Sequence, residues 1–268
     1  MNFTRGVVYV DNSITNTTTN PPSANYYGYG LKNLINALVN NIPGLSIQTV
    51  TTSTSKEYKV TLNYKGLLFD VYNSSNYLYV HVGSLTASNI CYALTSKSVV
   101  SFMYSDEGIL SFSMTALSAS GTLGGNVLSI IPVEFKLSDG TTKELFWFKY
   151  SPSFDSKLGN IPQFATSRTD LKLSLLIDPD SQTQYTFHIS GEDTGPVQEA
   201  KGKSVAIPLT FTNSYGEVVS YNVKGSSPLY VIYPGTVDKL KSYYAGTQVV
   251  YIGNVPYIGI DYYYFIRT

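Results

Sequence analysis

One short pattern occurs twice in the chain, 76 residues apart, and it constrains the fold more than any other feature. Residues 131–140 read IPVEFKLSDG, and residues 207–216 read IPLTFTNSYG. At the same offset, Ser151-Pro152 is matched by Ser227-Pro228. A shared spacing of Ile-Pro, Phe, Gly and Ser-Pro indicates duplication rather than coincidence. We therefore expect one β module to be used twice.

Each copy of the pattern predicts an antiparallel hairpin. The first has strands over 127–137 and 142–150, and the second has strands over 204–212 and 217–223. Because proline lacks an amide donor, it lies at strand starts, edges or bulges, and we expect both hairpins to expose the edge that carries Ile-Pro. Short strands with frequent turns favour sandwich or small-barrel modules, and an Ig-like sandwich is our leading interpretation.

The region before the repeats predicts one helix and an antiparallel meander. An apolar stripe with helical spacing starts after Gly30 and is ended by Pro43-Gly44. Its members are Leu31, Leu34, Ile35, Leu38, Val39 and Ile42. Alternating apolar and polar residues then predict strands over 45–50, 56–64, 67–72, 77–82, 99–104 and 109–115, with a hairpin turn at Lys65-Gly66.

These patterns divide the chain into four parts. We expect a mainly β fold with one N-terminal amphipathic helix, in which an α+β platform is followed by two related antiparallel β-sandwich-like modules. Residues 1–25 predict an extended arm whose deletion leaves folding intact and reduces self-association. The platform covers 26–118, the first module 119–196 and the second 197–268. Small residues over 118–125 predict a flexible linker between platform and modules.

The charge content argues against a nucleic-acid-binding protein, and the lengths of the apolar runs argue against a protein that spans a membrane. Lys plus Arg and Asp plus Glu are equal at 18 each, and only 13% of the residues are charged, against ~25% in an ordinary soluble domain. Since binding to phosphates requires a basic surface, we expect no direct contact with nucleic acid. No apolar run approaches the ~18 residues of a membrane span, and residues 1–25 lack the apolar core of a cleavable signal.

Two residue types bear on covalent modification. Cys91 is the single cysteine, which excludes an intramolecular disulfide and predicts a buried apolar thiol. Asn2, Asn16 and Asn73 begin N-x-Ser/Thr sequences, which permit glycosylation without indicating it.

The chain has no motif for a reaction. Its two histidines, His81 and His188, fall within different predicted strands and have no metal-ligand spacing. Asp155, Asp178 and Asp180 are candidate carboxylates for a glycan hydrolase, but no pattern pairs them, and Asp178 with Asp180 lacks the ligand density of a calcium site. We therefore expect no catalytic residue, no metal and no cofactor, and a chain that is not an enzyme.

Tyrosine dominates the aromatic residues, with 24 Tyr against 12 Phe and one Trp. A tyrosine ring supplies apolar area while its hydroxyl keeps a polar partner, so tyrosine is enriched at protein interfaces. The clustered tyrosines are our candidate interface: Tyr26, Tyr27, Tyr29, Tyr243, Tyr244, Tyr262, Tyr263 and Tyr264.

The repeat over 131–140 and 207–216, with the tyrosine run over 262–264, gives the chain a likeness to a class of proteins. It resembles structural virion proteins (tail, baseplate, turret or capsid-associated) of bacteriophages or archaeal viruses, in which a helix-bearing platform precedes Ig-like or jelly-roll modules. The resemblance extends over the whole chain in arrangement, rests on no diagnostic motif and transfers no functional residue. It implies a non-enzymatic structural component of the virion that associates with itself and with other virion proteins through Tyr-rich surfaces.

The alternative interpretation is a carbohydrate-binding or adhesion module that contacts a host glycan. Its platform would be Tyr26, Tyr27, Tyr243 and Tyr244. Such modules usually present several aromatics, with tryptophan prominent, whereas Trp147 lies in an apolar run typical of a core.

Overall fold

The protein is mainly β, with several antiparallel sheets and a helix near its N-terminus. The structure, a computed structural model, describes residues 1–13, 26–118, 121–136, 140–151, 173–185, 188–190, 205–212, 218–233, 249–260 and 264–268. The expected fold class is thereby confirmed.

The strands of the described residues form four sheets. The largest has the order β1-β7-β8-β9-β10-β11-β12, with β17 as a further partner of β9. Its strands are β1 (Phe3–Asp11), β7 (Lys97–Ser105), β8 (Leu110–Ser118), β9 (Gly121–Lys136), β10 (Thr142–Ser151), β11 (Leu173–Ile177), β12 (Gln184–Tyr185) and β17 (Tyr221–Val223). The meander consists of β2 (Leu45–Ser53), β3 (Tyr58–Tyr64), β4 (Leu67–Ser74), β5 (Tyr77–Val82) and β6 (Leu85–Ile90).

Two smaller sheets come from the C-terminal part of the chain. One has the order β14-β18-β21-β20-β19 and the other the order β13-β15-β16. Their strands are β13 (His188–Ser190), β14 (Val205–Pro208), β15 (Thr210–Thr212), β16 (Val218–Val219), β18 (Leu229–Tyr233), β19 (Val249–Ile252), β20 (Val255–Gly259) and β21 (Tyr264–Arg267).

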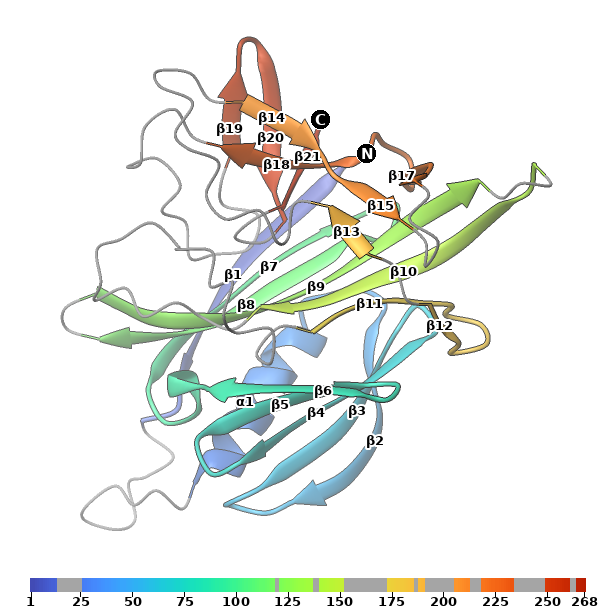
Figure 1. The fold of residues 1–268 in the computed structure, drawn as a ribbon. Coiled ribbons are helices and arrows are strands. Elements are labelled where there is room, and N and C mark those ends of the chain that lie inside the picture. The colour runs from blue at the N-terminus through green and yellow to red at the C-terminus, as the bar shows by residue number, and fades with distance from the viewer. Residues whose placement is uncertain are drawn as a thin grey trace.

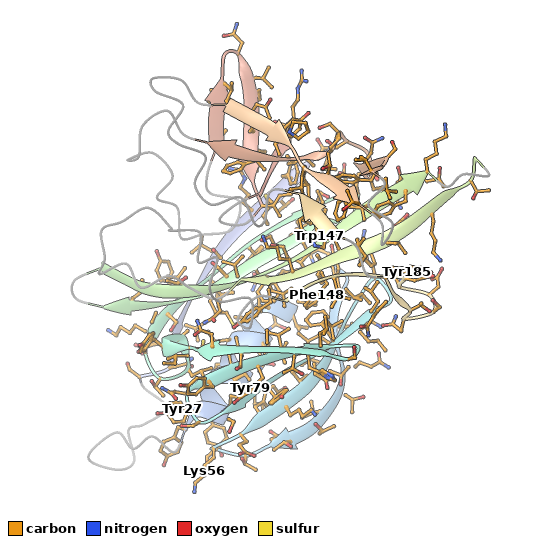
Figure 2. The ribbon with its side chains drawn as sticks, viewed as in Figure 1. Tyr27, Lys56, Tyr79, Trp147, Phe148 and Tyr185 are labelled. Atoms are coloured by element: carbon orange, nitrogen blue, oxygen red, sulfur yellow. The ribbon has the colours of Figure 1, made fainter. Side chains whose placement is uncertain are left out.

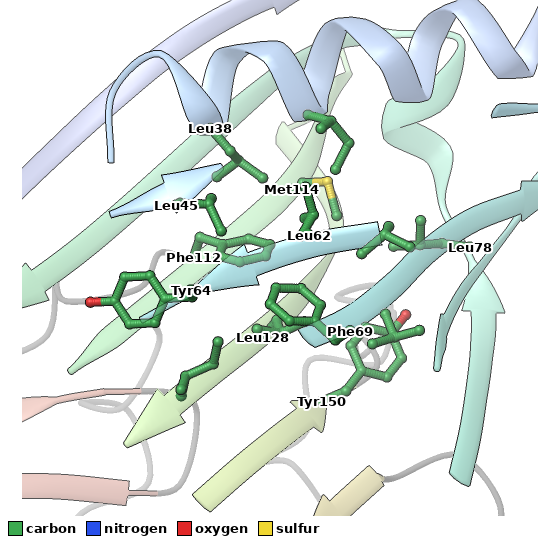
Figure 3. Close-up of a cluster of buried hydrophobic side chains, with 14 of the residues drawn as sticks. Leu38, Leu45, Leu62, Tyr64, Phe69, Leu78, Phe112, Met114, Leu128 and Tyr150 are labelled. Atoms are coloured by element: carbon green, nitrogen blue, oxygen red, sulfur yellow. The ribbon is translucent and has the colours of Figure 1, made fainter. Parts of the chain in front are cut away.

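The large sheet is the middle layer of the molecule (Figure 1). One of its faces packs on the helix α1 (Tyr27–Val39) and on the meander. This core, drawn in Figure 3, joins side chains of the meander to side chains of the large sheet. The rings of Phe69 from β4 and Phe148 from β10, for example, have centroids 5.2 Å apart. The helix and the two sheets therefore share one core.

The opposite face of the large sheet carries a second core against the C-terminal strands. Ile131 and Trp147 of the large sheet are fully buried there, together with Phe211 of β15 and Ile266 of β21. Aromatic rings contribute to this contact: Phe211 lies edge-on to Trp147 at a centroid distance of 5.5 Å. The C-terminal strands are thus attached to the large sheet by apolar burial.

The helix begins with two closely packed glycines. A Cβ added to Gly28 would lie 2.4 Å from the backbone oxygen of Thr54, and one added to Gly30 would lie 1.7 Å from that of Leu94. Leu94 ends a short 3-10 helix, η2 (Tyr92–Leu94). The first turn of α1 therefore lies against neighbouring backbone, and the helix starts four residues before Leu31, the first residue of the expected apolar stripe.

The first half of the expected N-terminal arm is a strand of the large sheet. All nine residues of β1 pair antiparallel with β7, from Phe3 opposite Ser105 to Asp11 opposite Lys97. Asn12, which follows, is fully buried and donates to the backbone oxygens of Gly30 and Ala93. Here the structure differs from the prediction, because β1 pairs with β7 along its whole length and Val8 and Val10 pack against the core. Residues 14–25 lie outside the described residues.

The described residues of the expected linker, 118 and 121–125, belong to two paired strands. Strands β8 and β9 pair from Leu110 opposite Ile130 to Ser118 opposite Gly121. Small residues are common to linkers and to strand connections, so composition alone did not separate the two. The boundary expected at residue 118 consequently falls within one sheet, and Phe112 before it shares a core with Phe148 after it.

The repeat is preserved in the pairing of the two hairpins. Phe135 lies opposite Lys143 in the first, and Phe211 lies opposite Val219 in the second, each 76 residues further along the chain. The rings of Phe135 and Phe211 also meet edge-on at a centroid distance of 5.6 Å. The second copy departs from the first on both sides of this pairing. Its Ile207-Pro208 segment, in β14, pairs with β18 in another sheet, and β17 pairs with β9 and not with its own hairpin.

The two Ile-Pro prolines occupy different environments. Pro208 lies exposed at the end of β14, an edge strand, as expected. Pro132 is buried within β9. On one side of β9, the pairing with β8 extends to Ile130 and the pairing with β17 begins at Val133, so Pro132 lies between these two neighbours. Its carbonyl accepts a hydrogen bond from the Lys224 N–H on that side, so the missing amide faces the junction between β8 and β17. The expectation of an exposed edge is therefore wrong for Pro132.

The sequon asparagine Asn73 is a buried structural residue. Its Nδ2 donates to the carbonyls of Lys56 (2.8 Å) and Ser75 (3.1 Å), and its Oδ1 accepts from the Tyr58 N–H (2.9 Å). The side chain is buried at the start of the β3–β4 pair. Since a glycan is attached to Nδ2, the folded protein cannot carry one at this position.

Replacing Asn73 by alanine is expected to lower the free energy of unfolding by about 1–2 kcal/mol. The change leaves the Lys56 and Ser75 carbonyls and the Tyr58 N–H without their side-chain partner. Neighbouring residues are exposed, so water can form some of the lost hydrogen bonds. Urea denaturation followed by circular dichroism measures the effect. Ser74→Ala, at the exposed neighbouring position on β4, is the matched control and is expected to change little. Equal stability of the two variants would contradict this role.

Candidate binding face

The meander buries one face against α1 and leaves the other to solvent. Along β5, Leu78 and Val80 are buried, whereas Tyr77 is 42% exposed, and β3 and β4 alternate in the same way. Strand geometry places every second side chain on the same side. We call the solvent side of β3, β4 and β5 the outer face; its central residues are Lys59, Thr61, Asp70, Tyr72, Tyr77, Tyr79 and His81. Figure 2 labels Tyr79 on this sheet.

A pair of stacked tyrosines lies at the centre of the outer face. Tyr72 and Tyr79 are opposite each other on β4 and β5, with ring centroids 4.8 Å apart and planes inclined by 7°. The Lys59 Nζ lies 5.2 Å from the centroid of Tyr72, within the range of a cation–π contact. Burial, and then the neighbouring Tyr79 and Asp70, raise the pKa of Tyr72, so its hydroxyl stays protonated at neutral pH. The pair offers flat apolar area together with hydroxyl groups.

Next to the tyrosines, a carboxylate gathers three polar partners. The Thr61 Oγ1 donates to the Asp70 Oδ1 at 2.6 Å, and the second oxygen of Asp70 lies 3.5 Å from His81 Nδ1 and 3.7 Å from Lys59 Nζ. The side chains of Lys59 and His81 are 43% and 38% exposed, and that of Asp70 is 21% exposed. Donors and an acceptor therefore reach solvent beside the stacked rings.

This arrangement is suited to binding. An imidazole beside a carboxylate also occurs in catalytic triads, where the imidazole activates a nucleophile. Here the hydroxyl that contacts the carboxylate belongs to Thr61, and it donates to Asp70 and not to His81. What remains is a sheet surface on which a planar or apolar group can stack while Asp70, Lys59 and His81 make hydrogen bonds.

The tyrosines expected at the interface near the N-terminus fall around the start of α1. Tyr26 and Tyr29 form a loose ring pair with centroids 6.1 Å apart, and Tyr29 is 43% exposed. Tyr27, labelled in Figure 2, is only partly exposed because it packs against the core under α1. Two of the three rings are thus placed for contact with a partner, and their interface role stays a prediction.

The other tyrosines of the candidate interface are not described at the level of side chains. Tyr243, Tyr244, Tyr262 and Tyr263 lie outside the described residues. Tyr264 belongs to β21, where its backbone is opposite Val231 of β18. Of these five tyrosines, only the backbone position of Tyr264, on β21 and not on α1, is described.

Those of the remaining sequence candidates that the structure describes do not belong to the outer face. His188 is in β13, in a different sheet from His81. Asp178 forms an ion pair with Lys143 (3.2 Å) and accepts the backbone N–H of Asp180 within a turn. Hydrogen bonds, first to the Tyr185 hydroxyl and then to Asp178, raise the pKa of Lys143. Asp155 lies outside the described residues, which themselves contain no group of three or more His, Cys, Asp or Glu suited to a metal ion.

A row of hydroxyls is buried on the second face of the large sheet. The Ser101 and Ser113 hydroxyls are 2.6 Å apart, and those of Ser111 and Ser129 are 3.0 Å apart. All four side chains are buried, as is Lys149 on the next strand. Because the serines bond to one another across strands, we interpret the row as packing between neighbouring strands.

Sequence reasoning missed Tyr72 and Tyr79 as a pair. The alternation on β5 placed Tyr79 on the polar side of its strand, but its cross-strand neighbour depends on the turn between β4 and β5. That turn has two residues, Ser75 and Asn76, with φ of +54° at Ser75. A two-residue hairpin fixes the register, so a recognised turn at this point would have placed the two rings opposite each other.

No family model, curated protein or solved structure matches this chain. Within the described ranges, no helix has the length and apolar character needed to cross a membrane.

Proposed function

We propose that this protein is a non-enzymatic structural component of a virus particle, and that exposed surfaces bind it to neighbouring subunits. The observation that carries the proposal is the outer face, where the half-buried rings of Tyr72 and Tyr79 stack beside Asp70. Protein interfaces are enriched in tyrosine, and their energy is concentrated in a few aromatic residues. The duplicated hairpins and the low charge content support the same proposal.

The partners in this proposal are other copies of the chain and other proteins of the virion. A chain with equal numbers of positive and negative residues has no net charge to oppose association. The Tyr26–Tyr29 pair offers a second aromatic surface, at the start of α1 and not on the meander sheet. Two surfaces on different elements would allow one subunit to contact two neighbours.

Purified virus particles from the organism that encodes the chain provide the direct test. Mass spectrometry is expected to find the protein at many copies per particle. Particles that contain all other structural proteins but lack this one would contradict the proposal. Within the same system, the Tyr72→Ala, Tyr79→Ala double variant is expected to reduce incorporation at least tenfold. Tyr251→Ala, a 68% exposed tyrosine on β19, is the matched control.

A second candidate function is a carbohydrate-binding or adhesion module, and the same outer face is the observation that favours it. Stacked rings beside Asp70 and Thr61 resemble a surface that holds a sugar ring and its hydroxyls. A glycan array separates the two candidates. Binding that is lost in the double variant and kept in Tyr251→Ala would favour the adhesion function. If the protein bound no glycan on the array, subunit assembly would remain as the role of this face.

A further inference from the structure

The strand β1 lies at one end of the large sheet, and within the described residues its outer edge is free. It pairs with β7 along nine positions, and among the described residues no strand pairs with its other side. Figure 1 shows β1 at the border of the sheet. An edge of this length presents a row of backbone donors and acceptors that can bind another strand.

The hydrogen bonds that flank β1 show which backbone groups point outward. The Asn12 N–H donates to the Ser96 carbonyl, and the Asp106 N–H donates to the Asn2 carbonyl. In an antiparallel pair the residues that exchange hydrogen bonds alternate along the strand. The even-numbered residues of β1 therefore bond to β7, and the odd-numbered residues present their N–H and C=O groups to the free edge.

Two apolar side chains along this edge are exposed. Val7 is 51% exposed and Tyr9 is 76% exposed, and both project on the same side of the sheet because they are two residues apart. Natural edge strands are usually protected by proline, lysine, bulges or a covering segment. β1 contains no proline or lysine, pairs with β7 without a register shift, and carries charge only at Arg5 and Asp11.

The sequence of β1 is complementary to itself in one antiparallel register. With a two-fold axis at Val7, all nine residues of one strand pair with the nine of the other. Each residue whose backbone groups face outward then lies opposite another such residue. Arg5 then lies opposite Tyr9 of the partner subunit on the side of the sheet that carries Val7. Arginine over a tyrosine ring is a favourable cross-strand contact, and the two Val7 side chains meet at the axis.

We propose that two copies of the chain associate through antiparallel pairing of β1 with β1, with Val7 at the two-fold axis, which joins their large sheets into one continuous sheet. This inference deepens the proposed function, since it names a second copy as one partner, and it uses a different strand from the outer face. Two-fold pairing of one surface with itself is also the commonest symmetry of homo-oligomers.

Disulfide trapping tests the register. In the proposed dimer the two Val7 Cα atoms are about 5.5 Å apart, so Val7→Cys is expected to give a covalent dimer under mild oxidation. In Tyr9→Cys the new thiols would be about 13 Å apart along the strands, and no covalent dimer is expected. The natural Cys91 does not interfere, because it is buried and burial raises its pKa to about 12.

A second variant tests the free edge without a cross-link. Val7→Pro removes an outward N–H that makes no bond to β7, so the monomer is expected to keep its melting temperature within a few degrees while dimerisation weakens at least tenfold. Mass photometry and thermal unfolding give the two readings.

Absence of a covalent Val7→Cys dimer, or cross-linking of Tyr9→Cys in its place, would overturn the proposal. In either case, if the unmodified chain still formed oligomers, the proposed function would stand and a different surface would carry the assembly. Dimerisation of Val7→Pro with unchanged affinity would also overturn it.

Discussion

Replacing Phe211 by alanine is expected to lower the free energy of unfolding by about 3–5 kcal/mol, the usual loss for a buried phenylalanine. Phe211 is fully buried between the C-terminal strands and the large sheet. Its ring contacts those of Phe135, Trp147 and Tyr221, with centroid distances of 5.6, 5.5 and 4.5 Å. Removal of the ring leaves a cavity at the point where the two copies of the repeat meet.

Urea denaturation followed by circular dichroism measures this loss. Trp147 is the single tryptophan and lies against Phe211, so its emission is expected to shift to longer wavelength in the variant. Val218→Ala, on the neighbouring strand β16 and 68% exposed, is the control and is expected to stay within about 0.5 kcal/mol of the unmodified protein. A loss below about 1 kcal/mol for Phe211→Ala would contradict the packing of the C-terminal strands on the large sheet.

Replacing Gly30 by alanine is expected to destabilise the protein by about 3 kcal/mol, although alanine is the better helix former. Intrinsic propensity alone favours alanine within a helix by about 1 kcal/mol. At this position, however, the added Cβ would lie 1.7 Å from the backbone oxygen of Leu94, so the helix or η2 must move. Overpacking against backbone of this kind typically outweighs the gain in propensity.

Lys32→Ala, at an exposed position on the same helix, separates the two effects. It changes helix propensity only slightly and touches no buried contact, so its melting temperature is expected to match that of the unmodified protein. Thermal unfolding of both variants gives the comparison. A Gly30→Ala protein at least as stable as the unmodified chain would show that α1 does not pack directly on the backbone of η2.

Much of the local structure could be predicted from the sequence, because it depends on periodicity and turn chemistry. The hairpin turn at Lys65-Gly66 has both residues at positive φ and joins β3 to β4 as expected. The helix was found from the spacing of Leu31, Leu34 and Leu38, which are fully buried. The 76-residue repeat predicted two hairpins. The first is present along its length, whereas the second keeps the same register only at Phe211 and Thr212.

The arrangement of distant strands could not be predicted in this way. The pairing of β1 with β7 joins residues about a hundred positions apart, and nothing in the local pattern of residues 3–11 names its partner. In the same way, β17 leaves its own hairpin to pair with β9 next to Pro132. Such choices depend on the burial of whole faces, which single-strand periodicity does not encode.

The candidate site shows the same division. Sequence clustering selected tyrosines that are adjacent in the chain, such as Tyr26 and Tyr29, whereas Tyr72 and Tyr79 come together only through the pairing of β4 with β5. Asp70 gains His81 and Lys59 as neighbours from two different strands. A surface that combines residues from several strands can therefore be recognised in the fold, but not from residues that are adjacent in the sequence.

The measurement that tests the central claim most directly is the mass distribution of the unmodified chain over a wide concentration range, by mass photometry with light scattering as a check. A protein that works by assembly through its surfaces is expected to form dimers or larger closed oligomers whose fraction rises with concentration. A monomer at every concentration would contradict self-association as the work of this chain.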